Sequence, residues 1–170
     1  PISKLEEIPN NPKQRYELMT KDMPLGGELS LDMMYRTCGT QLNIDYNSEK
    51  DFIKKFKIIN SIVPISIALF ENSSIVEKKN SNYLSYRSKV WQNTSRGGLP
   101  KLFFEELNFE KYAEFIINFP ILFIQDKGVF ISGRKYTFKD FMNGKIKEVN
   151  NRLPAENDLT THLSTIFTEN

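Results

Sequence analysis

Residues 37–46 carry side chains that could bind a small polar ligand or a metal ion. The segment reads TCGTQLNIDY, in which polar and apolar residues alternate. Side chains alternate between the two faces of a β-strand, so four polar groups would share one face: Thr37, Gln41, Asn43 and Asp45. A rigid strand is a good support for a precise site. A solvated sheet face has the same pattern, and the alternation alone leaves both interpretations open.

A second candidate is an arginine beside the single tryptophan of the chain. Trp91 follows Arg87 by four residues in the segment NYLSYRSKVWQNTSRGG, which spans residues 82–98. A guanidinium binds a carboxylate or a phosphate through two parallel hydrogen bonds, and an aromatic ring can form one wall of such a site. The spacing therefore predicts either an anion-binding pair or a surface arginine over a partly buried tryptophan.

Several common catalytic motifs are missing from the sequence. It contains no Walker A loop, dinucleotide-binding glycine motif, zinc-protease helix motif or nucleophile elbow. His162 is the single histidine, which excludes a multi-histidine zinc site and leaves one possible base for a serine triad. We expect His162 to lie on a helix face and to make a structural hydrogen bond.

Composition narrows the class of protein further. Lys and Arg total 23 against 21 Asp and Glu, which argues against a nucleic-acid-binding surface. The longest apolar run, residues 62–70, is interrupted by Pro64 and falls short of the roughly 20 residues of a membrane-spanning helix. Cys38 is the single cysteine, so we expect no internal disulfide and a reducing, cytoplasmic location. Its place on the apolar strand face predicts a buried thiol rather than a reactive one.

The elements that must position these residues follow from periodicity and capping signals. Residues 28–34 and 39–46 both alternate and predict a β-hairpin, whose apolar face enters the core. Ser48 and Asp51 have capping-box spacing ahead of a helical pattern that reaches Ile67, and Pro64 is predicted to kink or end that helix. Residues 71–82 are polar and predict a loop.

The C-terminal half shows the same kinds of signal. Asn108 is predicted to cap a helix that runs to about Phe119. The segments 121–125 and 129–132 flank Asp-Lys-Gly and predict a second hairpin. Thr137 with Asp140 predicts a short capped helix before Gly144, and a last helix should cover residues 157–162. The class is α+β, with a mainly antiparallel sheet and packed helices.

Three segments resemble the glutamate–cysteine ligase family of the plant and alphaproteobacterial type. They are MPLGGELSLDMMYRTCGTQLNIDYNSEKDF, PISIALFENSSIVEKKNSNYLSYRSKVW and LPAENDLTTHLSTIF, in unchanged order over nearly the whole chain. The family reads approximately LGLDMM-x-RTCTVQVNLD and YLSYRS-x-W at the corresponding places. The matching positions are Asp32, Met33, Met34, Arg36, Thr37, Cys38, Gln41, Asn43, Asp45, Arg87, Ser88 and Trp91.

The resemblance implies the first step of glutathione biosynthesis. ATP would phosphorylate the γ-carboxylate of L-glutamate, and the amine of L-cysteine would attack the acyl phosphate. The family is similar to glutamine synthetase in fold, with a curved antiparallel sheet that holds Mg²⁺, nucleotide and amino acid. Arg87 would hold a glutamate carboxylate, and Gln41 with Asn43 would face the substrates or, for Gln41, a magnesium ion. Thr37, Met34 and Trp91 would line the pocket.

The spatial prediction is that the amide-bearing face of the Gln41 strand and the Arg87 guanidinium open into one cavity. The chain lacks an initiator Met, and family members are longer. We therefore expect residues 1–170 to form a single domain, the central portion of a larger catalytic domain. Activity of the isolated chain is left open. Two alternatives are a non-catalytic module that binds an amino acid or carboxylate, and an interaction domain with an aromatic surface.

Overall fold

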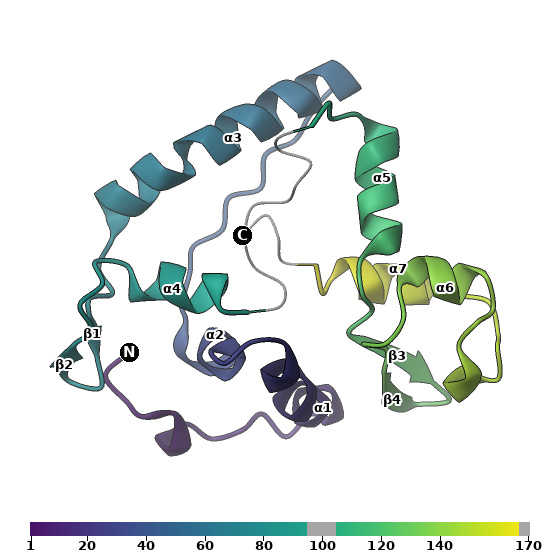
Figure 1. Ribbon diagram of the computed structural model, residues 1–170, viewed down its shortest axis with the longest axis horizontal. Helices are drawn as coiled ribbons and strands as arrows, with labels where there is room; N and C mark the ends of the chain where they lie inside the picture. The colour runs from purple at the N-terminus through teal and green to yellow at the C-terminus, as the bar shows by residue number, and fades with distance from the viewer. Residues whose placement is uncertain (95–104, 167–170) are drawn as a thin grey trace.

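A computed structural model describes residues 1–94 and 105–166 (Figure 1). Short 3₁₀ turns cover Leu5–Glu7, Met23–Gly26 and Lys147–Val149. The helices are α1 (Gln14–Asp22), α2 (Ser30–Arg36), α3 (Glu49–Phe70), α4 (Tyr86–Gln92), α5 (Phe109–Asn118), α6 (Phe138–Met142) and α7 (Glu156–Leu163). The strands are β1 (Ile75–Val76), β2 (Lys79–Asn80), β3 (Phe123–Asp126) and β4 (Val129–Ser132).

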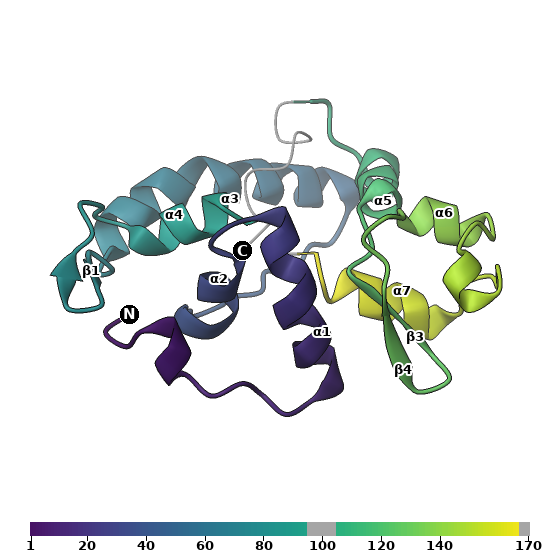
Figure 2. The same ribbon diagram turned by 60° about the horizontal axis from the view of Figure 1, so that its bottom comes forward.

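Helices and small antiparallel sheets make up the described chain, which confirms the α+β class. β1 pairs with β2, and β3 pairs with β4 in the register Phe123 with Ser132. Within residues 1–94 and 105–166 both sheets have two strands, so the larger sheet predicted from the sequence is not seen there. The views in Figures 1 and 2 place α3 along one outer edge and α1 with α2 on the opposite side.

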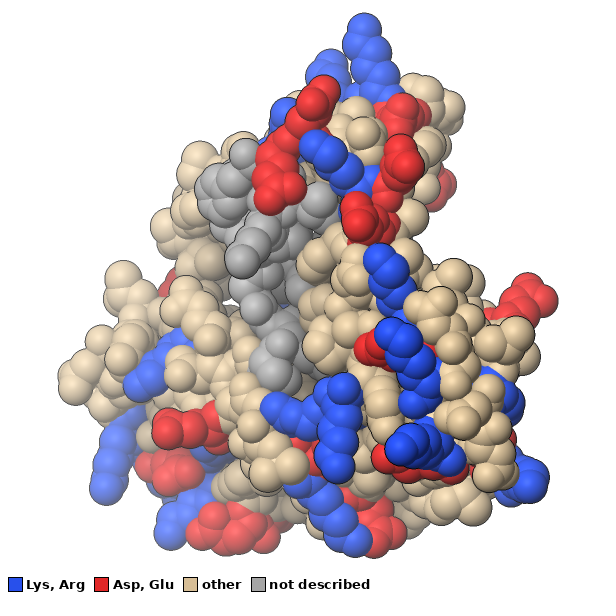
Figure 3. Space-filling model, turned by 45° about the vertical axis from the view of Figure 1, so that its right-hand side comes forward, with Lys and Arg blue, Asp and Glu red and all other residues tan. Residues whose placement is uncertain are grey.

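The largest core cluster lies in the C-terminal third. Aliphatic and aromatic side chains from the β3 region, α6 and the following 3₁₀ turn pack together: Ile121, Ile124, Phe138, Phe141, Ile146 and Val149. Apolar burial of this kind is the main stabilising contribution to a fold. On the face that this end of the molecule presents in Figure 3, positive and negative side chains lie interspersed.

Capping signals located the starts of α3, α5 and α6 correctly. Ser48 accepts a hydrogen bond from the Asp51 N–H at 3.2 Å, and Asn108 accepts one from the Lys111 N–H at 2.8 Å. Thr137 and Asp140 form the predicted reciprocal capping box. These bonds satisfy N–H groups that have no partner within the helix. The second hairpin and the last helix are also confirmed.

The predicted first hairpin is wrong, because residues 30–36 form helix α2 instead of a strand. Asp32 and Arg36 are four residues apart, and the Arg36 Nε donates to Asp32 Oδ1 at 2.8 Å. Met33 and Met34 pack toward the cluster of Met23, Leu122 and Phe123. The i,i+4 pair and this packing favour a helix over the alternation of a seven-residue window.

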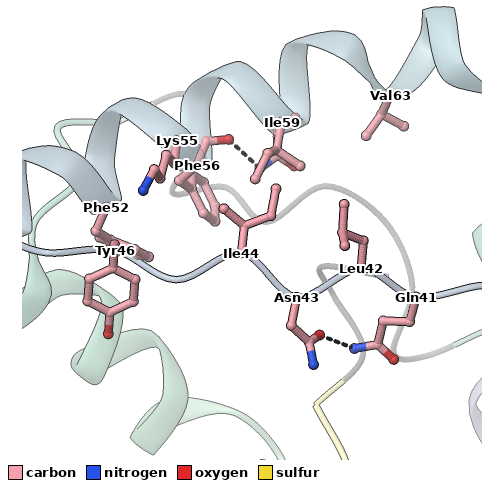
Figure 4. A pocket seen from close by; sticks show the side chains of 11 residues that line it. Gln41, Leu42, Asn43, Ile44, Tyr46, Phe52, Lys55, Phe56, Ile59 and Val63 are labelled. Atoms are coloured by element: carbon pink, nitrogen blue, oxygen red, sulfur yellow. Dashed lines mark hydrogen bonds between the residues drawn. The ribbon is translucent and has the colours of Figure 1, made fainter.

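Residues 37–46 are extended, but they form no strand with other described residues. The prediction that their apolar face is buried is wrong: Leu42 is 81% exposed and Cys38 is exposed. The alternation itself is preserved, because Leu42 and Ile44 point toward α3 while Gln41 and Asn43 point away (Figure 4). The periodicity therefore identified an extended segment but not its partners.

Helix α3 continues through Pro64 to Phe70, so of the two predicted effects of this proline, a kink or an end of the helix, the second does not occur. Pro64 removes one N–H donor, yet the helix continues on its C-terminal side. The polar stretch after α3 contains the small β1–β2 hairpin rather than a loop throughout. None of the helices in the described ranges combines the length and apolarity that crossing a membrane requires.

Candidate functional site

Arg87 lies in the first turn of α4, which is fixed at its N-terminus by serine side chains. Ser85 caps the helix by accepting from the Ser88 N–H at 3.1 Å. The Arg87 N–H donates to Ser73 Oγ at 3.1 Å, and Ser73 Oγ donates to Glu71 at 2.7 Å. Burial alone would raise the pKa of Glu71, but hydrogen bonds from Ser85 and Ser73 hold it below its ordinary value. This carboxylate therefore stays charged and anchors the start of α4.

The Arg87 side chain is oriented by one main-chain oxygen and one ring. Its Nε donates to the Cys38 carbonyl at 3.3 Å, and its guanidinium carbon lies 5.5 Å from the centre of the Trp91 ring. A methyl group on Gly39 would come within 3.2 Å of Nη2. Across the described part of the chain, Arg87 forms no ion pair. Its charge is therefore available to an external anion.

A cavity of about 460 Å³ lies beside this guanidinium, and we call it the Arg87 cavity. It is formed by the N-terminal segment, the end of α2, the β1 region and α4. Its lining residues are Pro1, Ile2, Asp32, Arg36, Thr37, Cys38, Asn72, Ser73, Ile75, Tyr86, Arg87 and Val90. The volume suits a small polar molecule.

Arg36 also lines the Arg87 cavity, but its charge is neutralised. It hydrogen-bonds Asp32, donates from Nη1 to Glu77 Oε1 at 2.7 Å, and donates to the Ser3 carbonyl at 3.0 Å. Its side chain is 6% exposed. Burial would lower the pKa of Arg36, but the two carboxylates raise it above its ordinary value. Arg36 therefore remains charged within a buried ion-pair network.

This network also fixes a turn with unusual backbone geometry. Glu77 and Lys78 have φ angles of 50° and 65°, in the left-handed region that favours glycine. The Glu77 ion pair with Arg36 holds this turn of the β1–β2 hairpin against α2. Sequence reasoning did not assign Arg36, Asp32 and Glu77 to a network. The i,i+4 spacing of Asp32 and Arg36 was a usable signal for that pair, whereas Glu77 lies 41 residues from Arg36.

Tyr86 also lines the Arg87 cavity. Burial raises its pKa above the ordinary value, and the nearby charge of Asp32 raises it further. The phenol therefore keeps its proton at neutral pH. A protonated hydroxyl in a partly buried position can donate a hydrogen bond to a bound ligand.

Gln41 and Asn43 lie at a second hollow, which we call the α3 groove. It measures about 330 Å³ and lies between residues 41–46 and α3 (Figure 4). Gln41 Nε2 donates to Asn43 Oδ1 at 3.0 Å, so the two amides bind each other. Gln41 and Asn43 therefore lie at a different hollow from Arg87, with their amides turned away from α3, and the single shared cavity predicted from the sequence is not formed by the described residues.

The other sequence-predicted residues are divided between the site and the core. Thr37 lines the Arg87 cavity, and its hydroxyl donates to the Met33 carbonyl at 2.6 Å. Trp91 contacts Arg87 one helical turn away. Met34 instead packs toward the core cluster of Met23, Leu122 and Phe123. The segment after Trp91 lies mostly in residues 95–104, outside the described ranges.

The donor set for a metal ion is small in this part of the molecule. The described residues contain no group of three or more His, Cys, Asp or Glu side chains placed to hold a metal. Gln41 offers one amide oxygen, whereas Mg²⁺ takes six oxygen ligands, several of them water. The described residues alone therefore do not fit a protein-held magnesium site.

His162 has the structural role predicted for it. It is 2% exposed, its Nε2 lies 2.9 Å from the Ile116 carbonyl oxygen, and its ring stacks on Phe138. These contacts join α7 to α5 and α6. The site chemistry therefore has to come from other residues.

Comparison with known proteins identifies the family. Residues 2–170 match the family described as glutamate-cysteine ligase family 2 (GCS2), and the chain belongs to this family. This confirms the resemblance that the sequence motifs indicated. The match covers both the Arg87 segment and residues 37–46.

Individual relatives agree with this assignment. The chain is 43% identical over 168 residues to the chloroplastic glutamate–cysteine ligase of Nicotiana tabacum, covering 97% of this chain and 32% of that protein. It is 42% identical to the chloroplastic ligase A of Oryza sativa subsp. japonica, with coverages of 97% and 34%. The Arabidopsis thaliana chloroplastic ligase is 41% identical, with coverages of 96% and 32%. The chain thus spans about a third of the length of these relatives.

The names of these relatives also correct one prediction. A cytoplasmic location was inferred from the single cysteine, and it is wrong, because the relatives are named as chloroplastic enzymes. The number of cysteines determines whether an internal disulfide can form. It does not distinguish one reducing compartment from another.

Proposed function

We propose that this chain forms part of an ATP-dependent glutamate–cysteine ligase, the enzyme of the first step of glutathione biosynthesis. The proposal is supported by membership of the family and by the names of the relatives. The γ-phosphoryl group of ATP would pass to the γ-carboxylate of L-glutamate and release ADP. The amine of L-cysteine would then attack the acyl carbon, lose a proton and release phosphate.

The observation that carries the proposal is the open guanidinium of Arg87. Its Nε is held by the Cys38 carbonyl, and it has no carboxylate partner in the described ranges. A guanidinium in this state is suited to bind a carboxylate through its terminal nitrogens. We assign this role to a carboxylate of L-glutamate, with Thr37 and Trp91 beside it. Met34 would support the pocket from the core.

Residues 37–46 carry the second part of what we propose. Their main chain makes no hydrogen bond to the main chain of other described residues, although the segment is extended and alternates in polarity. An extended segment whose main-chain N–H and C=O groups are unpaired can pair with a neighbouring strand. We propose that the segment is a strand of a larger antiparallel sheet in a glutamine-synthetase-like fold. The chain would then be the central portion of a larger catalytic domain.

In such a sheet, Gln41 and Asn43 would project from the face opposite α3. They would contact substrate, and Gln41 would offer one oxygen to the Mg²⁺ that accompanies ATP. The further ligands would have to be water, phosphate oxygens or other protein groups. The chemistry that ATP and Mg²⁺ supply is activation of the carboxylate, whereas Arg87 binds and orients the amino acid.

The test of the Arg87 role is steady-state kinetics on the complete gene product that contains this chain. Arg87→Ala is expected to raise the KM for L-glutamate by about 30- to 100-fold, because a charge-assisted interaction is lost. Lys89→Ala is the matched control. It removes a positive charge from the same helix, but Lys89 lies over the Tyr83 ring and does not line the Arg87 cavity.

An unchanged KM for glutamate in the Arg87 variant would remove the proposed role. Equal changes in the Arg87 and Lys89 variants would show a general charge effect rather than a specific contact. The non-catalytic binding-module alternative receives no support from the comparisons. ADP release that requires both glutamate and cysteine would exclude it directly.

A further inference from the structure

Helix α3 carries an apolar stripe that faces the α3 groove. Phe52, Phe56, Ile59 and Val63 are spaced at i, i+4, i+7 and i+11, and all four line the groove. Leu42 and Ile44 point toward this stripe from the extended segment (Figure 4). Phe56 is also buried against Leu107. This side of α3 therefore has a partner within the chain.

A second apolar stripe on α3 has the same spacing and remains exposed. Its members are 50%, 46%, 60% and 72% exposed, and they are Ile58, Ile62, Ile65 and Leu69. Each residue of a helix is rotated by about 100° from the one before, so the mean direction of this stripe lies about a third of a turn from that of the groove-facing stripe. The exposed stripe therefore cannot be covered by the residues that line the α3 groove.

The chemistry of this surface defines what can cover it. Residues 58–70 read IINSIVPISIALF and contain no charged side chain. A helix that is apolar around most of its circumference is normally buried, and a large contiguous apolar patch marks an interface. The partner must therefore be apolar and must lack charges at the contact.

We propose, on the basis of the proposed function, that the stripe of Ile58, Ile62, Ile65 and Leu69 packs in the complete gene product against an apolar face of the polypeptide that corresponds to the part of the longer relatives outside the matched segment. The N. tabacum ligase is about three times as long as the matched segment, which covers 32% of it. That length is ample for another layer of structure over α3. Helix α3 would then lie between two apolar layers, which explains why its sequence is apolar on two sides.

Hydrogen–deuterium exchange on the complete gene product and on the 170-residue chain tests this proposal. The peptide 58–70 should exchange at least about tenfold more slowly in the complete product, because the layer over α3 hinders opening of the helix. Equal exchange in both proteins would overturn the proposal. Protection that appears in the isolated chain only at high concentration, together with a doubled mass, would also overturn it, because a second copy would then be the partner.

A pair of variants makes the test specific to the stripe. Ile62→Asp places a negative charge within the stripe, whereas Lys57→Asp places one at an exposed position about 140° away from Ile62 around the helix. Ile62→Asp is expected to lower the melting temperature of the complete product and to leave that of the isolated chain unchanged. Lys57→Asp should leave both unchanged. Equal tolerance of the two charges in the complete product would contradict the proposal, and none of these outcomes depends on the chemistry at Arg87.

Discussion

At the scale of single residues, two arginines that line one cavity differ in whether carboxylates balance their positive charge. Arg36 is buried and is neutralised by Asp32 and Glu77, whereas Arg87 is held by a carbonyl and has no ion-pair partner in the described chain. A buried charge is costly unless it is paired, while an exposed charge is stabilised by water. Arg36 is therefore suited to holding structure and Arg87 to binding an anion.

The buried pair gives a stability prediction. Arg36→Met should lower the free energy of unfolding by about 3–5 kcal/mol, because it leaves the buried Asp32 carboxylate uncompensated. Urea-induced unfolding measures this loss. Lys21→Met is the matched control, since Lys21 and Glu17 form another i,i+4 pair that is largely exposed. A similar loss of unfolding free energy in both variants would contradict the expectation that the buried ion pair matters more than the exposed one.

Prediction from sequence at this scale succeeded where partners are close along the chain. The four-residue spacing of Arg87 and Trp91 indicated their contact, and the histidine was correctly assigned a structural role. The contact between Arg36 and Glu77 crosses 41 residues, and no local pattern encodes it. The exposure of Cys38 was missed because alternation fixes which face a side chain takes, but not what covers that face.

At the scale of elements, a charged cluster joins α7 to β3. Arg152 donates from Nε to Asp126 at 3.0 Å and from two terminal nitrogens to Asp158 at 2.7 and 2.9 Å. Asp158 also accepts from the Ala155 N–H at 2.7 Å and so caps α7. Burial would raise the pKa of Asp158, but the bonds from Arg152 and Ala155 hold it below its ordinary value of 3.8.

This cluster predicts a pH dependence of stability. A carboxyl group whose pKa is lower in the folded state stabilises the fold above its unfolded pKa, and this contribution is lost as the pH falls through the folded pKa. The urea midpoint should therefore fall on acidification below about pH 4, and less so in Asp158→Asn. Glu17→Gln should keep the wild-type dependence, because the Glu17–Lys21 pair is exposed. Identical pH profiles for wild type and Asp158→Asn would contradict the role of this cluster.

Helices and strands were predicted correctly where the sequence signal comes from residues that are close together in the chain. Side-chain caps located the starts of α3, α5 and α6, because each cap is a contact over three residues. Residues 28–34 alternate in polarity, but Asp32 also pairs with Arg36 at the helical i,i+4 spacing, and the packing of Met33 and Met34 favours the helix. Strand pairing needs a partner from elsewhere in the chain, which periodicity does not supply.

At the scale of the whole molecule, the main features are an exposed apolar stripe on α3 and an extended segment that belongs to no sheet in the described chain. Residues 37–46 make no main-chain hydrogen bond to the main chain of other described residues, although the Cys38 carbonyl accepts from Arg87. The chain covers about a third of its relatives, and the family match extends over residues 2–170. Motifs identified the family because several uncommon residue combinations occur together, whereas the long-range fold could not be inferred from the segment alone.

A structure of the complete gene product with L-glutamate bound would show whether Arg87 receives a carboxylate of the amino acid, as we propose. We expect a glutamate carboxylate at about 3 Å from the terminal nitrogens of Arg87, with Trp91 beside it. Glutamate bound elsewhere, with the Arg87 guanidinium still open to solvent, would exclude this role of Arg87.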